Sequence, residues 1–258
     1  MASKTKGALA MRYIARHDLR SLVVFLVLTA GAAAQIPDKF TNLQVLPKDI
    51  PKSELTGIMR NFAGDLGVRC GFCHVGGDTN TLQGVNFASD ESDKKKSARI
   101  MIRMVQSINQ DHLTRLGATP SPQVACVTCH RGNSDPRTID AVLAASINKD
   151  GPQAAVALYR KLKAENYGNG KYDFTDIPLN KLGESLLDAD KVKEATPILE
   201  LDAELNPKSE WGRYLLGVAH ASSGEKERAR ADFQKVLEMN PKNSGARKRL
   251  EALDKPAK

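Results

Sequence analysis

The chain has 258 residues, of which 41% are hydrophobic and 26% are charged, and its formal net charge is +8. This balance is typical of a globular protein and excludes a fibrous or wholly disordered chain. Because five of the basic residues lie within the first 34 positions, the positive charge does not indicate nucleic-acid binding. Only 5% of the residues are aromatic, so a bulky buried cofactor would help to fill the core.

The first 34 residues have the order of a secretory signal peptide. Basic residues come first, an apolar run extends from Leu22 to Ala30, and small residues follow at positions 32–34. We expect cleavage before Gln35 and a periplasmic protein, free or peripheral to the inner membrane. The apolar run is shorter than the roughly 20 residues of a transmembrane helix, which leaves an uncleaved anchor as the weaker alternative.

A first helix is predicted from Ser53 to Leu66, ending at Gly67. Its apolar stripe includes Leu55 and Met59, one turn apart. A methionine on such a stripe fills the core or serves as a metal ligand. On spacing alone, both roles remain open for Met59.

All four cysteines lie in two copies of one motif, C-x-x-C-H: Cys70, Cys73 and His74, and then Cys126, Cys129 and His130. Exported cysteines are normally paired in disulfides, but this spacing is that of c-type haem attachment. Two thiols at this spacing bind the two vinyl groups of one haem, and the adjacent histidine binds the iron. The sequence therefore predicts two covalently bound haem c groups, with His74 and His130 as proximal iron ligands.

Between the motifs, a second amphipathic helix is predicted from about Ser92 to Leu116. Met101 and Met104 lie one turn apart on its apolar face, so only one of them is expected to reach the second iron. His112, lower on the same helix, is a competing ligand or an exposed residue near the helix end.

After the second motif the cysteines stop and a 34-residue period appears. Residues Leu182-Gly183, Ala195, Leu199 and Pro207 recur as Leu216-Gly217, Ala229, Phe233 and Pro241. This period is typical of tetratricopeptide repeats, which are stacked helix pairs. A degenerate third pair is expected at residues 139–147 and 152–165, followed by an interrupting loop at 166–170. Asp135-Pro136 indicates the border between a di-haem domain (35–137) and a helical repeat domain (138–258).

Several short segments between residues 40 and 137 match one known family in order: 42–46 (NLQVL), 71–75 (GFCHV), 86–90 (NFASD), 98–104 (ARIMIRM) and 127–132 (VTCHRG). They resemble the cytochrome subunit of photosynthetic reaction centres. The resemblance implies Met59 as distal ligand of the first haem and Met104 of the second, with Met101 and His112 as second choices. Typical members carry four haems, whereas this chain has two motifs and a different second half.

These features together predict a mainly α protein: helix–turn–C-x-x-C-H units followed by a tetratricopeptide-like solenoid. The expected function is electron transfer between redox proteins, with a photosynthetic reaction centre or a respiratory complex as partner, and no enzymatic activity. The alternatives are a di-haem peroxidase, which needs an open iron, and an adaptor whose repeats recruit a partner. The repeats are expected to dock a protein or to cap the haem domain; a nucleic-acid partner is not expected.

Overall fold

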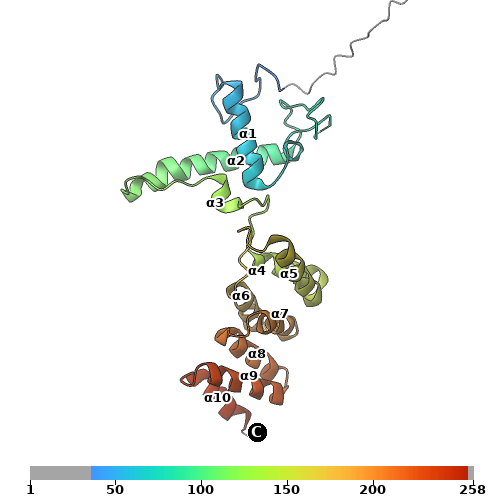
Figure 1. Cartoon of the computed structure of the whole chain (residues 1–258), viewed down its shortest axis with the longest axis vertical. Helices are drawn as coiled ribbons and strands as arrows, with labels where there is room; N and C mark the ends of the chain where they lie inside the picture. Colours follow the sequence, from blue (N-terminus) through green and yellow to red (C-terminus); the bar gives the residue numbers. More distant parts are fainter. Residues whose placement is uncertain (1–35, 79, 255–258) are drawn as a thin grey trace, which may run out of the picture.

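The computed structural model describes residues 36–78 and 80–254, and these residues are mainly helical (Figure 1). The predicted signal peptide and its cleavage position lie outside them. Two isolated β-bridges, Val75 with Asn86 and Asp78 with Gln83, are the only sheet pairing in this part of the chain. The prediction of a mainly α fold is confirmed. Among the described helices, none combines the length and the apolar character needed to cross a bilayer.

Six elements lie in the chain up to the second motif, two helices of 15 residues and four shorter turns. They are α1 (Lys52–Leu66), η1 (Cys70–Phe72), α2 (Asp93–Ser107), η2 (Ile108–His112), η3 (Leu113–Leu116) and α3 (Cys126–His130). Helix α1 ends at Gly67, whose φ of 64° is left-handed and whose N–H bonds the last turn. Helix α2 begins after Ser92, whose hydroxyl accepts a hydrogen bond from the Lys95 N–H.

The prediction of one regular helix from Ser92 to Leu116 is wrong beyond Ser107. The backbone changes to a π turn over Ile108–His112 and then to a 3₁₀ turn. Asn109 supplies the physical reason, because its side-chain amide donates to the Val124 carbonyl and accepts from the Val124 N–H, both at 2.8 Å. This two-bond clamp ties the turn to the segment just before the second motif and displaces His112 from the α-helical register.

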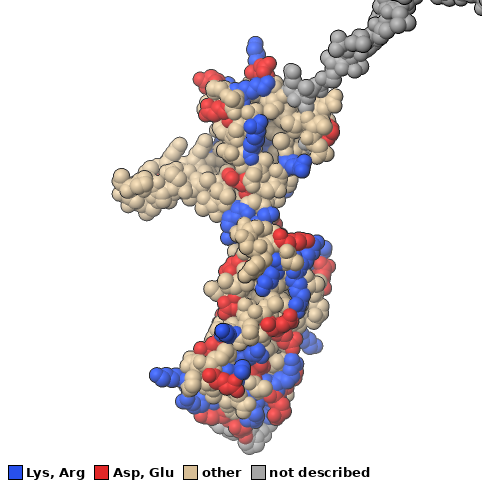
Figure 2. All heavy atoms as spheres, viewed as in Figure 1, with Lys and Arg blue, Asp and Glu red and all other residues tan. Residues whose placement is uncertain are grey.

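The remaining helices form a stack of antiparallel pairs that extends away from α3 (Figure 1). They are α4 (Ile139–Asp150), α5 (Pro152–Asn166), α6 (Ile177–Asp188), α7 (Val192–Leu205), α8 (Glu210–Ser222), α9 (Lys226–Met239) and α10 (Ser244–Leu253). Acidic and basic residues are interspersed over this stack (Figure 2). The degenerate third pair, expected at residues 139–147 and 152–165, is observed as α4 packed against α5.

Two glycines explain why the 34-residue period includes Leu-Gly. A Cβ on Gly183 would lie 2.3 Å from Leu199 Cδ2, and a Cβ on Gly217 would lie 2.7 Å from Phe233 Cε1. In each pair the glycine lets the second helix press a large side chain against the backbone of the first. The repeated residues are thus the contact points of successive helix pairs.

Buried apolar residues are distributed very unevenly. Before Ile139, only Ile50 and Leu55 are buried apolar residues among those described, whereas the helices from α4 onward contain two hydrophobic core clusters. Helix α2 contains no buried residue at all, although one of its faces is apolar. The residues around the two motifs therefore have apolar surface that the protein itself does not cover.

Candidate functional site

The first motif follows directly from the end of α1. The His74 N–H donates to the Cys70 carbonyl at 3.0 Å, which closes a tight turn around both cysteines. Burial lowers the pKa of His74, and the positive charge of Lys95 lowers it further. The neutral imidazole that results is the form that binds a metal. Burial also raises the pKa of the Cys73 thiol, and all four cysteines are unpaired.

The second motif is a single helical turn, α3, that packs against α1. Burial is also the main cause that raises the pKa of Cys126, with a contribution from nearby Asp65. The His130 Nδ1–H donates to the Asn133 carbonyl at 2.8 Å. Because Nδ1 is engaged in this way, Nε2 keeps its lone pair for a metal ligand bond.

An unusual backbone turn makes the His130 contact. Arg131, with φ of 49°, and Gly132, with φ of 74°, are both left-handed, so the chain folds back over the imidazole. The Gly132 N–H donates to the Asp65 carbonyl at 2.8 Å, and a Cβ on Gly67 would lie only 2.1 Å from the Gly132 carbonyl oxygen. The end of α1 and the second motif are thus in direct backbone contact. A left-handed non-glycine residue is strained, and such strain is concentrated at functional sites.

Three segments that carry the sequence resemblance meet at Asp90. Its carboxylate accepts from Asn42 Nδ2 at 2.9 Å and is ion-paired with Arg99 at 2.9 Å and with Lys95 at 3.2 Å. The Arg99 hydrogen bond, followed by the Asn42 bond, holds the Asp90 pKa well below its ordinary value. These polar residues, which sequence reasoning did not single out, join the loop before α1 to the start of α2. Their wide sequence separation left no periodic signal.

The predicted distal ligands lie on three different elements. Met59 lies half-buried on α1, Met101 and Met104 are 37% and 42% exposed on α2, and His112 is exposed at the end of the π turn. With Ile100, which is 65% exposed, the two α2 methionines form a continuous apolar face. Helix α2 and its continuation project sideways as an arm that is almost uncharged in the view of Figure 2.

The residues present fit covalently bound haem. Free thiols lie beside each motif histidine, Nε2 of His130 is left available by the Nδ1 hydrogen bond, and the α2 face offers methionine sulfurs on uncovered apolar surface. A large apolar ring system would cover that face and supply the buried apolar bulk that the residues before Ile139 lack. The His74 ring already packs edge-on against Phe87, with ring centroids 5.1 Å apart.

The family description "Photosynthetic reaction centre cytochrome C subunit" matches residues 29–210, which is more than half of the chain. The chain belongs to this family. The match runs beyond Arg137 and includes α4 to α7, so it does not end at the predicted domain border. A tetratricopeptide repeat matches residues 212–243, which confirms the interpretation of the 34-residue period.

Among curated relatives, the photosynthetic reaction center cytochrome c subunit of Thermochromatium tepidum is 30% identical over 60% of this chain and 34% of its own length. Cytochrome c-554 of Chloroflexus aurantiacus is 34% identical over 43% of this chain and 24% of its own length. The chain thus spans about a third or less of these cytochromes. Among solved structures, the first tetratricopeptide domain of human RPAP3 is 19% identical, with a TM-score of 0.32, over 45% of this chain and 86% of that domain.

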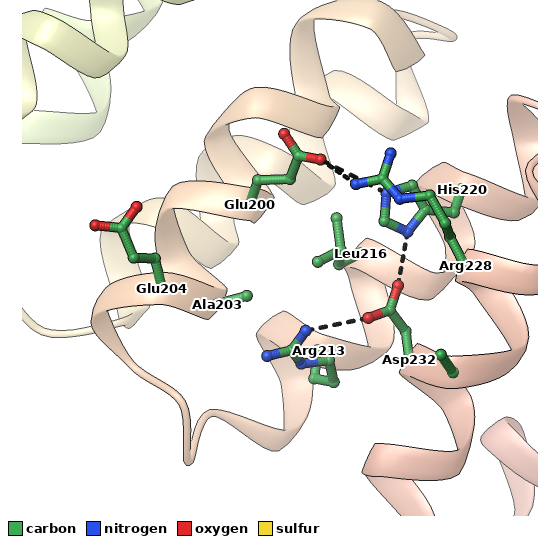
Figure 3. A pocket seen from close by; sticks show the side chains of 9 residues that line it. Glu200, Ala203, Glu204, Arg213, Leu216, His220, Arg228 and Asp232 are labelled. Atoms are coloured by element: carbon green, nitrogen blue, oxygen red, sulfur yellow. Dashed lines mark hydrogen bonds and ion pairs between the residues drawn. The ribbon is translucent and has the colours of Figure 1, made fainter.

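A second polar cluster lies in a pocket of the repeat stack (Figure 3). His220, only 2% exposed, has Nδ1 2.6 Å from an Asp232 carboxylate oxygen, and Arg213 bonds the other oxygen at 3.1 Å. Arg228 joins α9 to α7 by an ion pair with Glu200 and also pairs with Glu225 at the start of its own helix. His220 thus packs between repeat helices, and most of the charges of this pocket pair with one another.

Proposed function

We propose that the chain is a periplasmic di-haem c-type cytochrome that transfers electrons between redox proteins. Family membership supports the cytochrome class, and the two C-x-x-C-H turns support one haem each. The observation that carries the proposal is the orientation of His130: its Nδ1 bond to the Asn133 carbonyl at 2.8 Å leaves Nε2 as the iron ligand.

The proposed ligand set has one histidine and one methionine at each haem. Cys70 and Cys73 hold the first haem, with His74 proximal and Met59 distal. The second haem is bound through Cys126 and Cys129, with His130 proximal and Met104 distal; Met101 and His112 are second choices. When bound, each haem supplies an iron that accepts or donates one electron.

The residues around each iron determine the reduction potential at which that electron moves. His130 retains its Nδ1 proton against a backbone carbonyl, and burial keeps His74 neutral. Methionine ligation raises the reduction potential relative to a second histidine. Apolar surroundings do the same, because they disfavour the additional charge of the oxidised centre. We therefore expect two relatively high potentials, which suit a donor to an oxidising partner.

The proposed partners are a redox donor and a redox acceptor. The curated relatives named as reaction-center subunits make a photosynthetic reaction centre the first acceptor to test, and a respiratory complex the second. The exposed repeat helices are proposed as a protein-docking surface.

A spectroelectrochemical titration of the mature holoprotein tests the proposal. The expected result is a mass increase of two haems, two low-spin centres and the far-red absorption band of methionine-ligated ferric haem. Replacing Cys126 and Cys129 by alanine should remove one haem and leave the spectrum of the other. A five-coordinate haem that binds carbon monoxide would contradict electron transfer through two closed sites and favour the peroxidase alternative.

A further inference from the structure

The second haem motif is joined to the repeat stack by a hydrogen-bonded chain. His130 Nδ1–H donates to the Asn133 carbonyl at 2.8 Å, and the Asn133 side chain donates through Nδ2 to the Tyr172 hydroxyl at 3.0 Å. Tyr172 lies 39 residues farther along the chain, in the segment between α5 and α6. The same residue, Asn133, therefore contacts the iron-ligand candidate with its backbone and the repeat stack with its side chain.

Asn133 needs an anchor because the turn that presents its carbonyl is short and strained. Arg131 and Gly132 are consecutive left-handed residues, and each left-handed non-glycine residue costs about 1 kcal/mol or more. The Gly132 N–H is fixed to the Asp65 carbonyl on one side. On the other side, two local bonds hold Asn133, its N–H to the His130 carbonyl at 2.8 Å and the Asp135 N–H to its Oδ1 at 3.2 Å. The bond to Tyr172 is the one that ties the turn to the repeat stack.

Tyr172 is itself held firmly by the repeat stack. Its ring lies 6.1 Å from the ring of Phe174, which also contacts Tyr159 at 5.7 Å and Tyr167 at 6.3 Å between centroids. Tyr159 is fully buried in the core formed by α4 to α8, and Tyr172 and Phe174 pack against that core. The hydroxyl of Tyr172 is thus positioned by the packing of a rigid helical core.

We propose that Tyr172 is a positioning residue for the second haem: through Asn133 it fixes the carbonyl that orients His130, so that the repeat stack controls the ligand geometry and the reduction potential of this haem. The inference rests on the proposed function. Among the described residues, the first haem has no such connection to the repeat stack: the backbone group that acts on His74 is that of Phe87, which lies in the loop before α2. A partner that binds the repeats and shifts Tyr172 would alter one haem only.

The hydrogen bond of His130 determines the direction in which the reduction potential should change. An Nδ1–H bond to a carbonyl increases the basicity of the imidazole, and a more basic ligand stabilises the oxidised iron. When the Asn133 carbonyl loses its anchor, this hydrogen bond weakens. The reduction potential of the second haem should therefore rise, whereas that of the first should stay constant.

The test uses the full-length holoprotein and the variant Tyr172→Phe, which keeps the ring packing and removes only the hydroxyl. Tyr214→Phe, in α8 and stacked on Trp211, is the matched control far along the stack. Electron paramagnetic resonance of the two ferric haems and a potentiometric titration are recorded for each protein. Asn133→Ala and the double variant complete a mutant cycle.

The proposal expects Tyr172→Phe and Asn133→Ala to change the g-values and raise the potential of the second haem only, with effects that do not add in the double variant. Unchanged signals for both haems, equal changes at both haems, additive effects, or the same change in Tyr214→Phe would each overturn it. Failure of the proposed function gives a different result from failure of this proposal. The mass of the protein without substitutions would then lack two haems, before any variant is compared.

Discussion

Asp202 on α7 should make the protein less stable above about pH 6 than at about pH 4, and Asp202→Asn should remove this difference. The side chain is 0% exposed, and one of its carboxylate oxygens has no hydrogen-bond partner among the described residues. The other accepts from Asn206 Nδ2 at 2.7 Å. Burial raises the Asp202 pKa from 3.8 to about 6, the negative charge of Asp176 adds to this shift, and the Asn206 bond opposes it.

Proton linkage gives the sign and the size of the effect of pH on stability. Between about pH 4 and pH 6 the folded protein keeps a proton on Asp202 that the unfolded chain has released, so stability falls as the pH rises through this window. Above it the penalty is constant. A shift from 3.8 to about 6 corresponds to at most about 3 kcal/mol. Asparagine has the same shape, can accept the Asn206 bond, and carries no charge.

Urea denaturation of the holoprotein, followed by far-UV circular dichroism at several pH values, measures the effect. At pH 4 the parent and Asp202→Asn should be equally stable, and at pH 8 the variant should be more stable by up to about 3 kcal/mol. Asp188→Asn, an exposed substitution at the end of α6, is the matched control and should show no such pH dependence. A variant that is less stable than the parent at pH 8, or a difference that does not change with pH, would refute the reasoning.

Three further outcomes are expected. Gly67→Ala should destabilise the part of the chain before Ile139 by more than the roughly 1 kcal/mol of a left-handed alanine, because its Cβ would lie 2.1 Å from the Gly132 carbonyl oxygen. Thermal melts measure this effect, with Gly57→Ala as the control, because a Cβ at Gly57 meets no atom within 4 Å. Met59→Ala and Met104→Ala should each make one haem high-spin, and two unchanged spectra would exclude both ligands. Because Asp90 has a lowered pKa, the stability that its carboxylate contributes should be present at neutral pH and lost in acid. Between about pH 5 and pH 2, the melting temperature of Asp90→Asn should therefore fall less than that of the parent protein.

The parts of this protein that the sequence predicts are those with a local chemical rule. The C-x-x-C-H spacing is set by the geometry of thioether attachment, and the helix ending at Gly67 is observed with that glycine in the left-handed conformation. The 34-residue period also has a local cause, since Gly183 and Gly217 are each needed for close contact within a helix pair. Each of these signals lies within one motif or one repeat.

What the sequence could not predict depends on contacts between distant segments. The π turn at residues 108–112 results from the Asn109 clamp on Val124, so the amphipathic pattern alone suggested a longer regular helix. The Asp90 cluster joins side chains from residue 42 to residue 99. Polar contacts of this kind have no periodicity, and their partners become visible only in three dimensions.

The loop after α5 is the clearest example. In the sequence, residues 166–170 are only an interruption of the repeat period. In the structure, the segment from Asn166 to Asp176 places Tyr172 against Asn133 and Lys171 close to Gly132. The family match likewise continues through this region to residue 210. A loop that a regular solenoid does not need thus forms the hydrogen bond that connects the repeat core to the second haem motif, which argues that the two halves work as one unit.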